Sequence, residues 1–158
     1  MTRAAEMPLP PYRHMPGVNA RPDEAFFAAV KASVPAATAD ETGAENVAWR
    51  YGLRLVNAGF YWEAHEVLEP VWLNAAPNSR ERHLVQAVIH LANGLLKQAM
   101  GRPGASLRLA ELCRGAFAGA FPSGSGRLMG IDYADAVSAV DALAQGRTDI
   151  RLSMRDEI

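Results

Sequence analysis

The residues best suited to chemistry are gathered in one short stretch, residues 59–72. This stretch holds two of the three tryptophans of the chain, together with one histidine and three glutamates. On a helix, with about 100° between successive residues, His65, Glu69 and Trp72 lie within roughly 60° of one another. A histidine four residues before a carboxylate can chelate a divalent metal ion. It can equally form a hydrogen bond that fixes the tautomer of the imidazole ring.

The amphipathic pattern of this helix indicates which of its polar side chains face the core. Leu68 borders the His65–Glu69 pair on the apolar side, so we expect the pair to be buried. Glu66 and Glu63 are expected to point progressively toward solvent. Polar groups in a bundle core are costly unless they satisfy one another or a ligand. The pair is therefore either a hydrogen-bonded lock between two helices or a site for a ligand or a metal.

The next helix brings further polar groups toward this stretch. If the two helices form an antiparallel hairpin, residues pair when their numbers sum to about 155. His65 then faces His90, and Glu69 faces Gln86. Under this register His65, Glu69 and His90 are three candidate ligands for a divalent metal, and Gln86 is a polar neighbour.

Helical periodicity recurs along most of the chain, and strand-type alternation is nearly absent. This pattern predicts an all-α fold, a single-domain helical bundle of about five to six helices. The longest helix is apolar on nearly all sides and is expected to be central. The predicted helices cover residues 23–34, 44–58, 61–74, 79–100, 103–118 and 132–146, with loops over residues 35–43 and 121–130.

Local signals place the ends of several helices. Gly59 stands where a helix C-cap is usual. Asn78, followed three residues later by Glu81, resembles a capping box at the start of the longest helix.

The two ends of the chain lack a helical pattern. Residues 1–22 contain five prolines and are predicted to form an irregular arm. Residues 23–146 form the predicted bundle domain. Residues 147–158 are a C-terminal tail to which the pattern assigns no structure.

Composition and charge narrow the class of protein. The chain has 16 Lys and Arg against 17 Asp and Glu, so its net charge is −1 and no general nucleic-acid binder is indicated. No apolar run is long enough for a membrane span, and the N-terminus does not resemble a signal peptide. The single cysteine, Cys113, excludes an internal disulfide. We therefore expect a cytoplasmic protein without a nucleic-acid or membrane partner.

Residues 57–72 resemble the signature of the domain of unknown function 309 family. That signature is a His, three residues, a Glu, two residues and then Trp or Tyr, which His65, Glu69 and Trp72 match. The resemblance implies an all-helical bundle whose function is not established. Metal binding by the signature has been suggested for this family.

Two further segments extend the resemblance over roughly residues 45–145. Residues 86–92 resemble the Gln-Gly-Leu-Ile-Gln-x-Ala segment of the family, and residues 104–109 resemble its Gly-Ala-x-x-Leu segment. The chain departs from the pattern at His90, where Gln is usual, and near Lys97, where His is common. The first departure adds a potential metal ligand and the second removes one.

The leading hypothesis is a non-catalytic helical-bundle protein with a buried polar cluster. The cluster binds an unidentified small molecule or a divalent metal, or it holds the fold together. Its members are His65, Glu69, Trp72, Gln86 and Glu66.

Two alternatives stay open at this point. One is a metal-dependent enzyme, such as a hydrolase, in which His65, Glu69 and His90 ligate the ion and Glu66 or a bound water does acid–base work. The other is a homo-oligomeric interaction module with Trp62 and the N-terminal arm at the interface.

Overall fold

The structure, a computed structural model, describes residues 7–155 of the 158-residue chain. Within these residues, no helix combines the length and the hydrophobicity needed to cross a bilayer. The elements follow one another as α1 (Ala25–Ala32), the 3-10 helix η2 (Asp40–Glu45), α2 (Val47–Ala58), α3 (Tyr61–Leu73), α4 (Arg80–Ala99), α5 (Pro103–Ala120), β1 (Arg127–Leu128), β2 (Ile131–Asp132) and α6 (Tyr133–Ala144).

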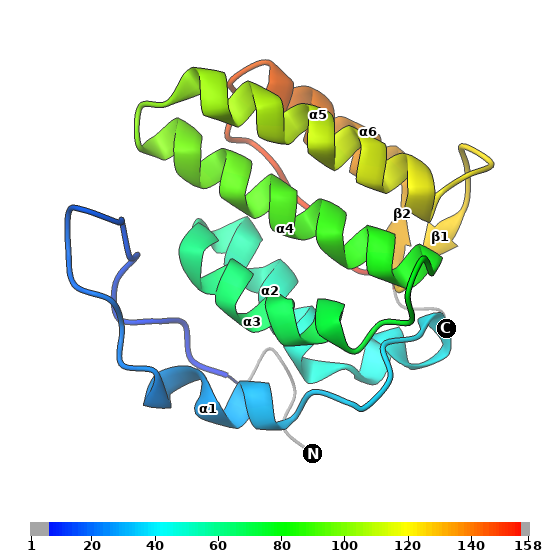
Figure 1. Cartoon of the computed structure of the whole chain (residues 1–158), viewed down its shortest axis with the longest axis horizontal. Helices are drawn as coiled ribbons and strands as arrows, with labels where there is room; N and C mark the ends of the chain where they lie inside the picture. The colour runs from blue at the N-terminus through cyan, green and yellow to red at the C-terminus, as the bar shows by residue number, and fades with distance from the viewer. Residues whose placement is uncertain (1–6, 156–158) are drawn as a thin grey trace.

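Helix α4 forms the centre of the bundle. It lies between the α2–α3 pair and the α5–α6 pair (Figure 1). Its position follows from its sequence, because apolar residues recur on most sides of the helix and all of them must be covered. The predicted all-α bundle is confirmed, and so is the central place of the longest helix. The buried residues of α4 are Leu84, Val85, Ala87, Val88, Leu91, Ala92, Gly94, Leu95 and Leu96.

The first half of the chain departs from the predicted boundaries around residue 44. The predicted loop over residues 35–43 contains most of η2, and α2 begins at Val47 rather than at residue 44. The side chain of Asn46 fixes this start, because its Oδ1 accepts a hydrogen bond from the N–H of Trp49 at 3.1 Å. The other end of α2 is as predicted, since Gly59 caps it with a φ of 90°.

The start of α4 is capped by a different residue from the one predicted. Ser79 is the N-cap, and its side chain accepts a hydrogen bond from the N–H of Arg82 at 3.1 Å. Asn78 stands one position earlier with a φ of 60°, so it belongs to the turn before the helix. The capping interaction predicted for Asn78 is therefore wrong.

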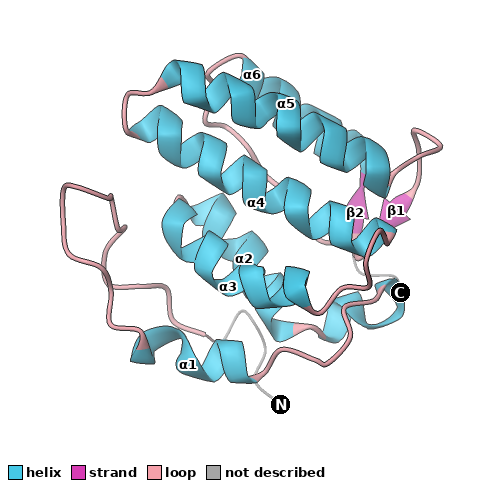
Figure 2. Ribbon diagram, viewed as in Figure 1, coloured by secondary structure: helices cyan, strands magenta, loops and turns pink. Residues whose placement is uncertain are grey.

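A β-hairpin lies in the stretch 121–130 and just beyond it, where only a loop was predicted. Leu128 pairs with Ile131, and the connecting residues Met129 and Gly130 have φ values of 46° and 80°. Positive φ at both central residues is what a two-residue type I′ turn requires. Each strand has only two residues, which is too short for alternation to be visible in the sequence. Figure 2 shows this hairpin as the only strand structure among the described residues.

In their described parts, residues 7–22 and 147–155, the arm and the C-terminal segment contain no α-helix, yet both contact the helices. The hydroxyl of Tyr51 on α2 donates a hydrogen bond to the carbonyl of Pro8 at 2.6 Å. Near the other terminus, the buried Leu152 exchanges two hydrogen bonds with the side chain of Asn57, at 2.8 and 2.9 Å. Helix α2 thus anchors both ends of the described chain.

Candidate functional site

Helix α3 is buried along one side. The signature residues His65, Glu69 and Trp72 lie at the edge of that side. The side chains of His65 and Glu69 are 36% and 52% exposed. The expectation that this pair is buried is therefore wrong. The centre of the buried arc is near Ala64 and Val71, roughly a third of a turn or more from His65 and Glu69. The residues of α3 that are buried are Glu63, Ala64, Val67, Leu68 and Val71.

Beside this buried side, α3 and α4 form a polar seam that reaches solvent. We define the α3–α4 seam as six residues that are each at least partly exposed: His65, Glu69, Trp72, Arg82, Gln86 and His90.

Two interactions across the seam fix its register. The guanidinium of Arg82 lies 4.1 Å from the centroid of the Trp72 ring, and the charge of His65 contributes to lowering the pKa of His90. The residue numbers of these pairs sum to 154 and 155. The antiparallel register predicted from the sequence therefore matches the structure.

The His65–Glu69 pair does not join two helices. Both residues belong to α3, and the distance between His65 Nε2 and Glu69 Oε2 is 3.7 Å. This distance is longer than an ordinary hydrogen bond. Half-exposed ion pairs of this kind contribute about 0.2–1 kcal/mol to stability. The pair is consequently a weak structural element and its polar atoms remain accessible.

Two polar atoms of the seam are buried without a hydrogen-bond partner, Nε1 of Trp72 and Nδ1 of His90. The contrast with Trp49 is direct, because its Nε1 donates to the carbonyl of Met129 at 3.0 Å. Burial is the main cause that lowers the pKa of His90, and the charge of His65 adds to it. His90 is therefore neutral at pH 7, and one of its ring nitrogens is an acceptor.

The three residues proposed as metal ligands do not form a ready coordination site. Among residues 7–155, no group of three or more His, Cys, Asp or Glu side chains is placed to hold a metal ion. His65 and Glu69 are close to each other, but His90 is not positioned with them as a third ligand.

Of the remaining residues that the sequence suggested for a site or an interface, one lies in the seam and two lie outside it. Gln86 lies in it, partly exposed, as the register predicts. Glu66 lies outside the seam, and its carboxylate forms an ion pair with Lys31 of α1 at 3.3 Å. Trp62 packs against the arm of its own chain, with its ring centroid 4.6 Å from that of His14.

Glu63 of α3 was expected to face solvent, and the structure shows it in the interior. Its side chain is completely buried, and its Oε2 accepts a hydrogen bond from the N–H of His14 at 2.8 Å. Its other carboxylate oxygen, Oε1, has no partner. Burial raises the pKa of Glu63, against the opposing effect of the His14 hydrogen bond. The arm covers this carboxylate, and helical periodicity alone gives no signal of an arm.

Residues 49–109 match the family model of the Domain of unknown function (DUF309). Over this span the chain is similar to that family. The match contains all six residues of the seam, and it confirms the family that the signature indicated. Comparison with curated proteins and with solved structures found no match. DUF309 is a family of unknown function, so this similarity by itself brings no substrate or activity.

Proposed function

We propose that the protein is a binding module that holds a small polar molecule in the α3–α4 seam. One observation carries this proposal. Trp72 Nε1 and His90 Nδ1 are buried and unpaired beside a His–Glu pair that is half-exposed. Buried polar atoms in native proteins nearly always have a partner, which is protein, water or a ligand. A ligand that enters between the side chains of the seam would supply one.

The side chains of the seam indicate the chemistry of this ligand. The Trp72 indole can only donate a hydrogen bond, and the Arg82 guanidinium on its face is a cation. Both favour a ligand group that accepts hydrogen bonds, such as a carboxylate or a carbonyl. Glu69, one turn back along α3, is an acceptor and favours a donor in the ligand. The molecule is therefore polar and carries both kinds of group.

A divalent metal ion at His65 and Glu69 is a second candidate. The 3.7 Å between His65 Nε2 and Glu69 Oε2 is too long for a good hydrogen bond, but it suits two ligands that share one ion at about 2 Å from each. Water would have to complete the coordination. A metal-dependent hydrolase requires a third protein ligand, so we do not extend the proposal to catalysis.

The test follows the indole N–H signals of Trp49, Trp62 and Trp72 by ¹H–¹⁵N NMR. The small-molecule fraction of a cell extract is added to the labelled full chain. We expect the Trp72 signal to shift, and the Trp49 signal to stay because its N–H already has a partner. Trp72→Phe removes the donor while it keeps an aromatic side chain, and Trp62→Phe is the matched control on the same helix.

Separate additions of Zn²⁺, Ni²⁺ and Mn²⁺ decide between the two candidates. A shift of the Glu69 amide signal that His65→Ala abolishes supports the metal. If neither the extract nor these ions moves the Trp72 or His65 signals, both candidates are wrong.

A further inference from the structure

The described part of the arm, residues 7–22, lies on a face of α2 and α3 that shares no residue with the α3–α4 seam. Figure 1 shows the arm in blue, outside the α2–α3 pair. We define the arm-binding face by six residues that contact the arm through hydrogen bonds or ring contacts: Tyr51, Arg54, Ala58, Phe60, Trp62 and Glu63. These contacts show what kind of segment the face holds.

Three side chains of the arm-binding face bind main-chain atoms of the arm. The hydroxyl of Tyr51 donates to the carbonyl of Pro8 at 2.6 Å, and the guanidinium of Arg54 donates to the carbonyl of the preceding residue. Further along the arm, Glu63 Oε2 accepts a hydrogen bond from the N–H of His14 at 2.8 Å. Hydrogen bonds to main-chain atoms do not depend on the side chains of the bound segment. A segment of different sequence can therefore make the same three contacts.

The prolines of the arm keep the bound segment extended. Pro8, Pro10 and Pro11 each lack an N–H and have φ restricted to about −65°. In the structure these residues belong to neither a helix nor a strand. The carbonyls of an extended proline-rich segment have no partner within the segment, so they accept hydrogen bonds from a partner surface. Surfaces lined by aromatic side chains recognise proline-rich segments in this form, and Tyr51 is such a side chain here.

A second part of the arm-binding face contacts side chains of the arm. The Arg13 guanidinium donates to the carbonyl of Ala58 at 2.7 Å and lies 5.5 Å from the centroid of the Phe60 ring. This carbonyl is at the C-terminal end of α2, where the helix dipole favours a cation. The ring of His14 meets the Trp62 ring edge-on, with 4.6 Å between the centroids. The face is therefore suited to an extended segment in which prolines precede an arginine.

Two features favour release of the arm while the bundle stays folded. Among residues 7–22, only Pro10, His14 and Pro22 are buried. Segments with few buried side chains open at a low cost in free energy. The turn of the arm is also held from within, because the side chain of Asn19 bonds to the main chain on both sides of His14. The turn can therefore keep its structure when it separates from α3.

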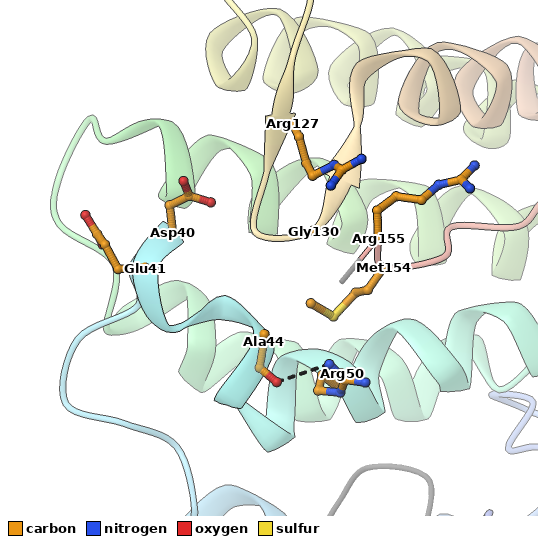
Figure 3. Close-up of a pocket in the computed structure, with 8 residues that line it drawn as sticks. All are labelled: Asp40, Glu41, Ala44, Arg50, Arg127, Gly130, Met154 and Arg155. Atoms are coloured by element: carbon orange, nitrogen blue, oxygen red, sulfur yellow. Dashed lines mark hydrogen bonds between the residues drawn. The ribbon is translucent and has the colours of Figure 1, made fainter. Parts of the chain in front are cut away.

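The hollow between η2, α2 and the hairpin differs from the arm-binding face in what its polar groups bind (Figure 3). There Arg50 donates to the carbonyl of Ala44 at 3.1 Å, within the same region of the chain. Asp132 pairs with Arg127 at 2.8 Å and with Arg155 at 3.4 Å. The donors and the acceptor of the arm-binding face instead bind a segment that can separate from the bundle. We therefore place a docking site at the arm-binding face.

We propose that the arm-binding face is a docking site for an extended segment of another protein in which prolines precede an arginine, and that the arm occupies this site as an intramolecular competitor. While the arm is bound, the face only holds the chain together. A short tether gives the arm an effective concentration in the millimolar range, so a partner must bind tightly to displace it. The arm of a second copy would make only the contacts that the arm already makes, so exchange between copies gains nothing.

Fluorescence anisotropy of a labelled synthetic peptide of residues 7–22 tests this proposal, with the peptide standing in for the partner. The peptide is titrated with the wild-type full chain and with the full-length His14→Pro variant. Proline lacks the N–H that Glu63 accepts, so the arm of the variant is a weaker competitor. The peptide should therefore bind the variant about ten-fold more tightly than the wild type. Val18→Ala is the matched control, because it changes an arm side chain that is 76% exposed and should leave the Kd at its wild-type value.

Two further measurements locate the site and test its preference. Peptide binding to the His14→Pro variant should return the indole N–H signal of Trp62 toward its wild-type position and leave that of Trp72 unchanged. A peptide with the Arg13→Gln substitution should bind about five-fold more weakly, because it lacks the charged donor.

The proposal is overturned if the peptide binds neither chain, or if it binds the His14→Pro variant no more tightly than the wild type. Equal binding of the Arg13→Gln peptide, or a shift at Trp72 in place of Trp62, would also overturn it. Sedimentation of the wild type as a dimer that His14→Pro abolishes would do the same, because the occupant would then be the arm of a second copy.

Discussion

Helix α3 has two polar regions that differ in how far the rest of the chain covers them. On one side, Glu63 is completely buried and the backbone of His14 in the arm holds it. On the other side, the side chains of His65 and Glu69 are 36% and 52% exposed. The chain itself covers the first region, and it leaves the second accessible. This difference favours a structural role for the first region and a binding role for the seam.

The buried side of α3 should also contribute more to the free energy of folding than the seam does. The buried residues of α3 face the helices that pack against it, and α2 and α3 approach closely at Gly52 and Leu68. Burial of apolar surface is the dominant favourable contribution to folding. Substitutions on the buried side of α3, which we call the closed side, should therefore cause large losses of unfolding free energy. Substitutions in the seam should cause small ones.

Leu68→Ala should cause the largest loss of stability on α3. Leu68 is completely buried, and removing three carbons from such a site usually costs about 2–5 kcal/mol of unfolding free energy. Glu69→Ala, at the adjacent seam position, should stay within about 0.5 kcal/mol of wild type. Urea unfolding followed by circular dichroism measures both. Equal losses for the two variants would remove the distinction between the closed side and the seam.

Gly52→Ala should be the next most harmful change. A Cβ at position 52 would lie 2.6 Å from Cγ of Leu68, which is closer than side-chain atoms approach in real proteins. Overpacking of this kind costs about 1–3 kcal/mol, and the better helix propensity of alanine offsets only part of it. A melting temperature at or above that of wild type would show that α2 and α3 are not tightly packed here.

Glu63→Gln should have a smaller effect whose sign depends on pH. Because burial raises the pKa of Glu63 above its usual 4.5, the folded state favours the protonated carboxyl. The ionised form costs stability above the folded-state pKa, and this cost disappears as the pH falls toward the unfolded-state value. Glutamine mimics the neutral form and can still accept the hydrogen bond from His14.

The variant should therefore melt at a higher temperature than wild type at pH 7, and this advantage should shrink as the pH is lowered to 4. Thermal melts across this pH range measure the difference. A wild type that is the more stable protein at pH 7 would contradict the account of Glu63.

Much of the fold was predictable because helical periodicity extends over long segments. The central place of α4 follows from its apolar residues, and the α3–α4 register follows from a short connection between two long helices. The hairpin at Met129 and Gly130 could not be predicted, since two-residue strands show no alternation. The cap of α4 was misplaced because Asn78 and Ser79 are both common N-cap residues.

The burial of the predicted site residues could not be predicted from the pattern of α3. The spacing of His65, Glu69 and Trp72 placed them on one face of α3, and the predicted register placed His65 opposite His90, whose pKa the charge of His65 helps to lower. Their exposure depends on which other elements cover α3, and the arm and α2 are not visible from the pattern of α3 itself.

The most direct test of the central claim is the unfolding free energy of His65→Ala measured in urea at pH 7. If the seam is open and the His65–Glu69 pair is a weak intrahelical contact, the variant should lose less than about 1 kcal/mol relative to wild type. A loss of about 3 kcal/mol or more is expected when one partner of a buried ion pair is removed. That result would make the pair a structural lock and would contradict the binding role of the seam.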